Sequence, residues 1–328
     1  MTAPVPEPVV SWRRRAVVWS LLLVSAVGVG LHFLLRDAWQ APTAVVFYAL
    51  PRPLLTAFTI LAALAARRLS RREFRLTVVA ASACLLWTLS HDVRWSAGTG
   101  TSSVPTLRIA LWNAAHLPRG VRAAAEIIRT WDADVIGVVE AGTTYELEQV
   151  EWRRELADYH VVCPRPQMLL ISRGPIHDVE VKSIGRHSEV ALARIEHGAE
   201  HVHVAVVDIV SHLSYGRAEP LRNLTQILEE RPTAPHVVMG DFNTPPESVW
   251  FDTLRARYRS AFEVAGRGYR PTWPVPIPML QLDFLWVRDD VTVNACRHGW
   301  TSASDHRPVI ADVKIATTAT RPANFPAE

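Results

Sequence analysis

The sequence contains few cysteines and almost no lysine. Its three cysteines, Cys84, Cys163 and Cys296, show no spacing typical of metal ligands, which argues against a cysteine-based metal module. A disulfide between Cys163 and Cys296 and two buried free thiols both remain open at this stage. Arginine outnumbers lysine 33 to 2, which we attribute to coding bias rather than to chemistry.

Several motifs of other enzyme classes are also missing. The sequence has no His-Glu-x-x-His, no Gly-x-Ser-x-Gly and no Walker loop. These absences leave no support for a zinc-peptidase site, a nucleophile elbow or a P-loop nucleotide site.

Most of the chain has no excess of positive charge. Residues 1–100 hold eleven arginines and four acids, a net charge of +7, whereas residues 101–328 hold 24 basic and 28 acidic residues, a net charge of −4; together they give +3. The larger part therefore has no overall cationic field to attract a nucleic acid, although a local basic groove remains open.

Three apolar runs occupy the first hundred residues. The run from Ala16 to Leu35 has twenty residues without a charge, about the length that crosses a bilayer core. A second run, about Phe47 to Ala66, is interrupted by Arg52 near its start, and a third extends from Leu76 to Ser90. We therefore predict a membrane domain with three transmembrane helices over residues 1–97, and the lipid bilayer as a partner.

Two arginine clusters, at residues 13–15 and 67–75, predict the orientation in a cell membrane. Both clusters should face the cytoplasm, so two spans separate them and the third span places residue 101 onward outside the cytoplasm. Arg52 would then lie near the outer interface and extend its side chain toward it. Two alternatives stay open: the first run is a secretory signal peptide, or two spans leave the domain in the cytoplasm.

The rest of the chain predicts an α/β domain. Residues 98–105 are rich in Gly, Ser and Thr and predict a linker, residues 106–316 form the domain, and residues 317–328 are expected to be a flexible tail. Short apolar runs alternate with stretches of helical spacing. The predicted strands are 107–112, 134–140, 190–195, 202–209, 236–239 and 309–313, and the predicted helices are 121–131 and 221–228.

Two motifs carry chemistry. Gly240-Asp241-Phe242-Asn243 follows a predicted strand, and Ser304-Asp305-His306-Arg307-Pro308 precedes another. Acid, amide, acid and imidazole are the groups that metal-assisted attack on a phosphoester needs. Their pairing in this order predicts phosphoester or phosphoanhydride hydrolysis.

The chain resembles the endonuclease/exonuclease/phosphatase superfamily, which includes deoxyribonuclease I-like nucleases, inositol polyphosphate phosphatases and neutral sphingomyelinases. The resemblance covers residues 106–315 and implies a four-layer α/β/β/α sandwich with its active site at one end, here preceded by three transmembrane helices. The matching residues are, in order, Asn113, Glu140, His212, Asp241, Asn243, Asp283, Asp305 and His306.

The resemblance also implies a divalent metal, Mg²⁺ or Mn²⁺, held by oxygen donors. Glu140 matches the acidic metal ligand of the family, and Asn113 and Asp305 would support the metal. Without the resemblance, a Glu that closes a strand is more often a solvated end residue, and an Asn after a strand is usually a turn residue.

The catalytic roles that the resemblance implies centre on a water molecule. Asp241 would align this water, Asn243 would donate to a phosphate oxygen, and Asp283 would orient His306, which takes a proton or stabilises charge. Whether Asp241 or His306 is the general base stays open.

Five residues are candidates for other roles. His212 would protonate the leaving oxygen, and Glu189 would orient His212 unless it is an ordinary surface residue of a strand. Arg222, Arg270 and Trp273 are candidate substrate contacts; the alternatives are an exposed helical arginine and a proline-rich surface loop.

A tethered, slightly acidic domain outside the cytoplasm favours a lipid-linked substrate such as polyprenyl pyrophosphate or a phospholipid. Three spans followed by this domain also resemble the VanJ-type membrane proteins, which are linked to glycopeptide-antibiotic resistance and polyprenyl pyrophosphate metabolism. The alternatives are a non-catalytic, membrane-anchored binding module and an extracytoplasmic nuclease. The nuclease would need a cationic groove built from Arg255, Arg257, Arg259, Arg267 and Arg270.

Overall fold

A computed structural model describes residues 12–39, 43–95, 107–142, 146–212 and 214–316. The chain divides into two compact units, Met1–Val93 and Arg94–Glu328. The predicted linker at 98–105 and the predicted tail at 317–328 lie outside the described residues.

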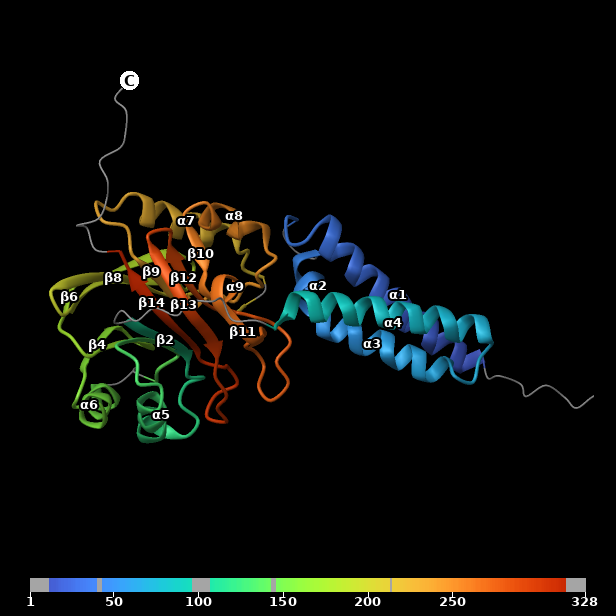
Figure 1. Cartoon of the computed structure of the whole chain (residues 1–328), viewed down its shortest axis with the longest axis horizontal. Helices are drawn as coiled ribbons and strands as arrows, with labels where there is room; N and C mark the ends of the chain where they lie inside the picture. The colour runs from blue at the N-terminus through green and yellow to red at the C-terminus, as the bar shows by residue number, and fades with distance from the viewer. Residues whose placement is uncertain (1–11, 40–42, 96–106, 143–145, 213, 317–328) are drawn as a thin grey trace, which may run out of the picture. The chain divides into compact units, whose positions relative to one another are not determined.

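The N-terminal unit is helical (Figure 1). A capping box starts its last helix, because Ser70 and Glu73 each accept a hydrogen bond from the backbone N–H of the other. Glu73 also pairs with Arg15 at 2.7 Å, so both arginine clusters lie at the same end of this unit. Its helices are α1 (Trp12–Leu34), α2 (Thr43–Ala49), α3 (Arg52–Ala66) and α4 (Arg71–Asp92).

Two of these helices, α1 and α4, are long and apolar enough to cross a membrane. The second predicted run does not form a third helix of this length, because the chain breaks at Pro51 and α3 has only 15 residues. A proline lacks the backbone N–H of a helix interior and is favoured at a helix start, which accounts for the break. The structure thus gives two such helices where the sequence predicted three.

Arg52, predicted to extend toward a membrane interface, is buried instead. Its side chain is 5% exposed and donates to both carboxylate oxygens of Asp92, at 3.0 and 2.6 Å. Its guanidinium also lies over the Trp87 ring. The prediction was wrong because it did not pair Arg52 with the acid at the end of α4.

The C-terminal unit contains two mixed β-sheets. One includes strands in the order β11-β13-β14-β2-β3-β5-β4, and the other has the order β10-β12-β9-β8-β7-β6. The strands of the first are β2 (Leu107–Asn113), β3 (Val135–Val139), β4 (His160–Arg165), β5 (Met168–Ser172), β11 (Gly266–Tyr269), β13 (Val291–His298) and β14 (Val309–Ile315). Those of the second are β6 (Ile176–Gly185), β7 (Ser188–His197), β8 (Glu200–Asp208), β9 (Val237–Asp241), β10 (Tyr258–Ser260) and β12 (Asp283–Arg288). The two-residue strand β1 (Val93–Arg94) precedes them.

Helices flank the pair of sheets. Figure 1 shows α5 and α6 on one side and α7 and α8 on the other. The helices of this unit are α5 (Gly120–Arg129), α6 (Glu146–Glu155), α7 (Ala218–Glu229), the 3₁₀ turn η1 (Val249–Phe251), α8 (Asp252–Arg255) and α9 (Ala261–Ala265).

Three apolar cores hold these layers together. Leu111 and Val139 of one sheet and Met239 and Leu285 of the other belong to the core between the sheets. The outer faces pack separately, around Trp112 under α5 and α6 and around Phe284 and similar residues under α7 and α8. The predicted α/β class and paired sheets are therefore confirmed. Cys163 and Cys296 are free thiols, not a disulfide.

Candidate active site

The strands bring polar residues to one edge of the paired sheets. Strands β2 and β3 run parallel, as do β8 and β9, so the chain leaves each pair at one edge. Asn113 ends β2, Asp241 ends β9, and Asp283 starts β12, which runs antiparallel to β9. Residues separated by up to 170 positions therefore meet there.

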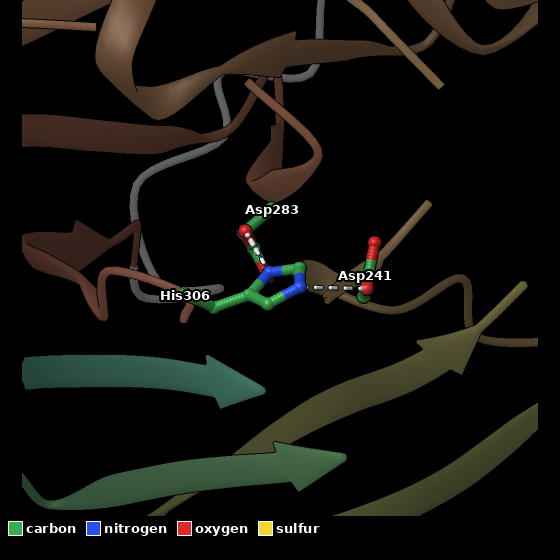
Figure 2. Close-up of side chains that lie close together, drawn as sticks. All are labelled: Asp241, Asp283 and His306. Carbon is green, nitrogen blue, oxygen red and sulfur yellow. Dashed lines mark hydrogen bonds and ion pairs between the residues drawn. The ribbon is translucent and has the colours of Figure 1, made fainter. Parts of the chain in front are cut away.

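Asp283, His306 and Asp241 form a buried group at this edge. His306 Nδ1 lies 2.9 Å from Asp283 Oδ2, and its Nε2 lies 3.9 Å from Asp241 Oδ2 (Figure 2). Figure 2 shows the imidazole ring between the two carboxylates. The two acids are almost fully buried, and the histidine is exposed by only 6%.

The electrostatics of this group favour proton exchange. Burial disfavours the charged imidazole, but the charges of Asp283 and Asp241 outweigh burial and raise the pKa of His306. Burial and the charge of Asp283 raise the pKa of Asp241, while His306 opposes this shift. His306 and Asp241 therefore compete for protons, which suits acid–base catalysis.

Asp241 is held by two asparagines. Asn113 Nδ2 donates to Asp241 Oδ2 at 2.9 Å, and the backbone N–H of Asn243 donates to Oδ1 at 2.8 Å. Asn243 has a left-handed φ of 45°, which asparagine adopts more readily than most residues. The preceding Gly240 permits close strand packing, because a Cβ there would lie 2.0 Å from the carbonyl oxygen of Val207.

Glu140 follows β3 with a φ of 51°, an uncommon conformation for a side chain of this size. Its carboxylate pairs with His116 Nε2 at 3.3 Å. His116 Nδ1 in turn contacts Gln167 Oε1 at 3.3 Å. Glu140 therefore lies in a polar cluster, and its side chain retains partial solvent access.

Asp208 is a site residue that sequence analysis missed. It ends β8 and pairs in register with Asp241 of β9, so both side chains project from the same face of the sheet. Burial and the charge of Glu140 raise the pKa of Asp208 to about 6, while Arg165 opposes this shift. Only its position at the end of a predicted strand could have marked it.

Glu189 has a different partner from the one predicted. It pairs in register with Asp208 and forms an ion pair with Arg165. Among the residues that the structure describes, no hydrogen bond joins Glu189 to His212. The exposed His212 instead contacts Ser214, at 2.7 Å from Nδ1 to the hydroxyl oxygen.

Arg217 is a second residue that the sequence did not reveal. This buried arginine donates to the carbonyl oxygens of Asn243 at 2.9 Å, Ser211 at 3.1 Å and Tyr215 at 2.9 Å. It therefore joins the loop that carries His212 to the Asp-Phe-Asn turn. Arg222, the predicted phosphate contact, is exposed and bonds to Ala218 within its own helix.

Asp305 and Trp273 are in direct contact. The Trp273 indole N–H donates to Asp305 Oδ2 at 2.9 Å, and its ring lies 6.4 Å from the His306 ring. Trp273 belongs to residues 271–282, a loop without any charged side chain. Ile277, near the tip of this loop, is 67% exposed.

Arg270, at the base of this loop, is buried. It donates to Glu263 and to Gln281, both at 2.6 Å. Its guanidinium therefore fixes the loop. A further arginine, Arg307, donates to the carbonyl oxygens of Tyr269 and Pro271, which gives the loop a rigid base.

The donor chemistry at this edge fits a divalent metal. Asp241, Asp283 and His306 each offer one ligand atom, all within 4.8 Å of one another. Asp283 Oδ1 is buried without a hydrogen-bond partner among the described residues. Carboxylate oxygens are the donors that a hard cation prefers. Asn113 turns its amide N–H to Asp241, and its Oδ1 accepts from the Ala115 backbone N–H.

Comparison with known proteins agrees with this geometry. A model of the "Endonuclease/Exonuclease/phosphatase family" matches residues 110–306. No curated protein matches the sequence significantly.

Several solved structures share the fold of the C-terminal unit. One is "a functionally unknown conserved protein" from Enterococcus faecalis V583, with 14% identity, 64% of this chain and 100% of that chain covered, and a TM-score of 0.54. D. rerio TDP2 complexed with a single strand DNA product is 16% identical, the match covers 64% of this chain and 100% of that chain, and the TM-score is 0.52. An endonuclease/exonuclease/phosphatase family protein from Bacteroides thetaiotaomicron is 14% identical, the match covers 65% of this chain and 99% of that chain, and the TM-score is 0.51.

Proposed function

Because the chain belongs to the endonuclease/exonuclease/phosphatase family, we propose that it is a membrane-anchored phosphoesterase that acts on a lipid-linked phosphate. Family membership makes it a hydrolase of phosphoester bonds. The proposed substrate class is polyprenyl pyrophosphate or a phospholipid, in line with the resemblance to VanJ-type proteins.

The observation that carries this proposal is the uncharged loop at residues 271–282. Its Trp273 contacts the residue next to His306, and its Ile277 is exposed. Trp300, 61% exposed, lies under the Arg307 guanidinium that holds the loop base. Large exposed apolar side chains on this loop and at its base favour a substrate with a hydrocarbon part.

The site residues can perform hydrolysis as follows. Asp241 aligns the attacking water, and Asp283 orients His306 toward the reacting centre. The water proton passes to Asp241 or His306, whose proton affinities are coupled. A divalent cation held by the carboxylates would polarise a phosphoryl oxygen.

The distribution of positive charge argues against the nuclease alternative. Arg255 and Arg270 both pair with Glu263 at 2.6 Å, Arg257 pairs with Glu229, and Arg259 pairs with Asp289. Four of the five arginines of the expected cationic groove therefore have acidic partners, which reduce the net positive charge that a groove would present to a nucleic acid. DNA binding by the structurally similar TDP2 keeps the nuclease as the second candidate.

The proposed location is a cell membrane, with several spans and the catalytic domain outside the cytoplasm. Two apolar helices support a membrane unit. Both helices start at the end where the arginine clusters lie, so the shorter apolar α3 returns the chain between them and α4 ends on the side opposite to the arginines. A reporter of extracytoplasmic location fused after residue 328 tests this orientation. An active reporter supports it, and a silent but expressed reporter places the domain in the cytoplasm.

The test of function uses the full chain in detergent micelles. Mg²⁺-dependent phosphate release from polyprenyl pyrophosphate is measured beside plasmid nicking, for wild type, Asp241→Ala and His306→Ala. His160→Ala is a matched control, because His160 is exposed at the opposite end of β4 from Arg165.

Phosphate release by wild type and His160→Ala alone would support the proposal. Nicking with the same pattern would establish the nuclease. Metal binding without turnover of any phosphoester would instead favour a non-catalytic module.

A further inference from the structure

Four acidic residues form one row across four neighbouring strands. Asp283 of β12 pairs with Asp241 of β9, Asp241 pairs with Asp208 of β8, and Asp208 pairs with Glu189 of β7. Directly paired residues share a face of the sheet, so these side chains project together. Strands lie about 4.8 Å apart, which places Glu189 about 10 Å from Asp241.

The row has different chemistry at its two ends. His306 contacts Asp283 and Asp241 at one end, and the uncharged Trp273 loop lies on that side. At the other end Arg165, from β4 of the other sheet, pairs with Glu189 and acts electrostatically on Asp208. The site therefore has an uncharged loop at one end and an arginine at the other.

Arg165 keeps capacity to bind a further anion. Its side chain is 43% exposed, and a guanidinium has five N–H donors, more than one carboxylate can use. An anionic group that approaches Asp208 and Glu140 meets two carboxylates. Arg165 is the nearby arginine that can offset this repulsion.

The direction in which water attacks the phosphorus determines which part of the substrate lies near Arg165. In phosphoryl transfer the attacking and leaving oxygens are roughly in line with the phosphorus. If Asp241 and His306 hold the water, the leaving group points along the row toward Asp208 and Arg165. If the hydrocarbon part of the substrate lies against the Trp273 loop, the inner phosphorus, which carries the hydrocarbon through an ester oxygen, lies near His306.

We propose that Arg165, positioned by Glu189, is a specificity-determining residue that binds the outer phosphate of a lipid diphosphate as the leaving group. This inference rests on the proposed function and narrows its substrate to a phosphoanhydride. The water oxygen bonds to the inner phosphorus, and the bond from that phosphorus to the bridging oxygen breaks. The electron pair leaves with inorganic phosphate, and the water proton passes through the Asp241–His306 pair to the phosphate or solvent.

Turnover provides the first test, on the full chain with farnesyl diphosphate and farnesyl monophosphate. Arg165→Ala should lower kcat/KM for the diphosphate at least tenfold and that for the monophosphate less than twofold. Arg165→Lys should recover part of the loss, because it keeps the charge but not the bidentate geometry. Glu189→Gln should show the same selectivity with a smaller loss. An equal loss on both substrates overturns the inference.

Arg173→Ala is the matched control. Arg173 has a similar exposure of 50% and an acidic partner, Asp132, but follows the end of β5 opposite to the site. It should leave both kinetic constants unchanged. A loss of diphosphate selectivity in this variant would count against a specific role of Arg165.

Oxygen labelling tests the direction of attack. Hydrolysis in ¹⁸O-water should place the label in farnesyl monophosphate rather than in inorganic phosphate. Label in inorganic phosphate would show attack on the outer phosphorus and overturn the assigned leaving group.

Binding separates this inference from the proposed function. In the presence of Mg²⁺, wild type should bind inorganic pyrophosphate more tightly than inorganic phosphate, and Arg165→Ala should lose this preference. If the preference is present but no lipid phosphate is hydrolysed, the proposed function fails and the anion site at Arg165 stands. If wild type shows no preference, the inference fails whatever the turnover.

Discussion

The imidazole of His306 and the carboxylate of Asp283 lie 2.9 Å apart, although 23 positions separate them in the chain. This contact turns the second ring nitrogen toward Asp241. It also supplies negative charge that favours the protonated ring. One residue thus sets both the orientation and the proton affinity of the histidine.

Asp283→Asn should separate these two effects, because it keeps the shape and removes the charge. We expect phosphoesterase activity to fall about 10–100-fold. The pKa of His306 should fall because its raised value depends on Asp283. NMR titration of the His306 ring measures this shift, and an unchanged midpoint would contradict the electrostatic role.

Substitutions of Trp273 should distinguish its two contacts. Trp273→Phe removes the N–H donor to Asp305 but keeps an aromatic ring, so kcat should fall less than tenfold for every substrate. Trp273→Ala should also raise KM for a lipid-linked substrate. Its KM for soluble bis(p-nitrophenyl) phosphate should stay close to that of Trp273→Phe. An equal rise in KM for both substrates would contradict the proposed contact between Trp273 and the hydrocarbon part of the substrate.

Arg217→Ala should lower activity more than Arg222→Ala. Arg217 is buried and donates to four carbonyl oxygens, which connect the loop of His212 to Asn243, whereas Arg222 is exposed. We expect at least a tenfold loss of kcat for the first variant and less than twofold for the second. A larger effect at Arg222 would instead support its predicted phosphate contact.

Two buried histidines should make the domain sensitive to acid. Burial lowers the pKa of His236 to about 4 and that of His298 well below 6.5. Both rings bind protons more tightly in the unfolded chain. The free energy of unfolding should therefore decrease as the pH falls from about 6.5 toward 4.

His298→Leu should reduce this dependence by about one proton. The ring packs on Phe262 with centroids 4.2 Å apart, so an apolar side chain is tolerated there. Denaturant unfolding of the full chain at several pH values measures the slope. His160→Leu, at an exposed position, should leave the slope unchanged; an unchanged slope in His298→Leu would refute the assignment.

The buried pair of Arg52 and Asp92 should respond asymmetrically to substitution. Arg52→Leu or Asp92→Leu alone leaves one buried charge without its partner, which costs about 3–5 kcal/mol. The double variant should be considerably more stable than either single variant, because it removes both charges. Thermal unfolding in detergent provides the comparison, and additive losses would indicate that the two residues do not act as a pair.

Local sequence patterns predicted the two strands that adjoin the motifs. The run at 236–239 corresponds to β9 and the run at 309–313 to β14, each within two residues at either end. Such buried strands are visible because their apolar residues are continuous. The break at Pro51 was visible too, but the apolar composition on both sides outweighed it in the prediction.

The pairing between distant strands could not be predicted from the same patterns. The resemblance to the family implied that Glu189 orients His212, whereas strand register places Glu189 beside Asp208 and its side chain pairs with Arg165. Asp208 lies within the predicted strand 202–209, and no role was predicted for it. Register depends on which strands become neighbours, so a single sequence shows the acids without showing that they form a row.

Gly240 affects both the packing of the sheet and the range of substitutions that the site can accept. It pairs with Val207 one position before Asp241 and Asp208, and a side chain there would collide with the Val207 backbone. Any residue larger than glycine would separate β8 from β9 and widen the gap between the two carboxylates. The backbone spacing therefore restricts the sequences that can combine a folded sheet with a complete row of acids, independently of any residue that touches the substrate.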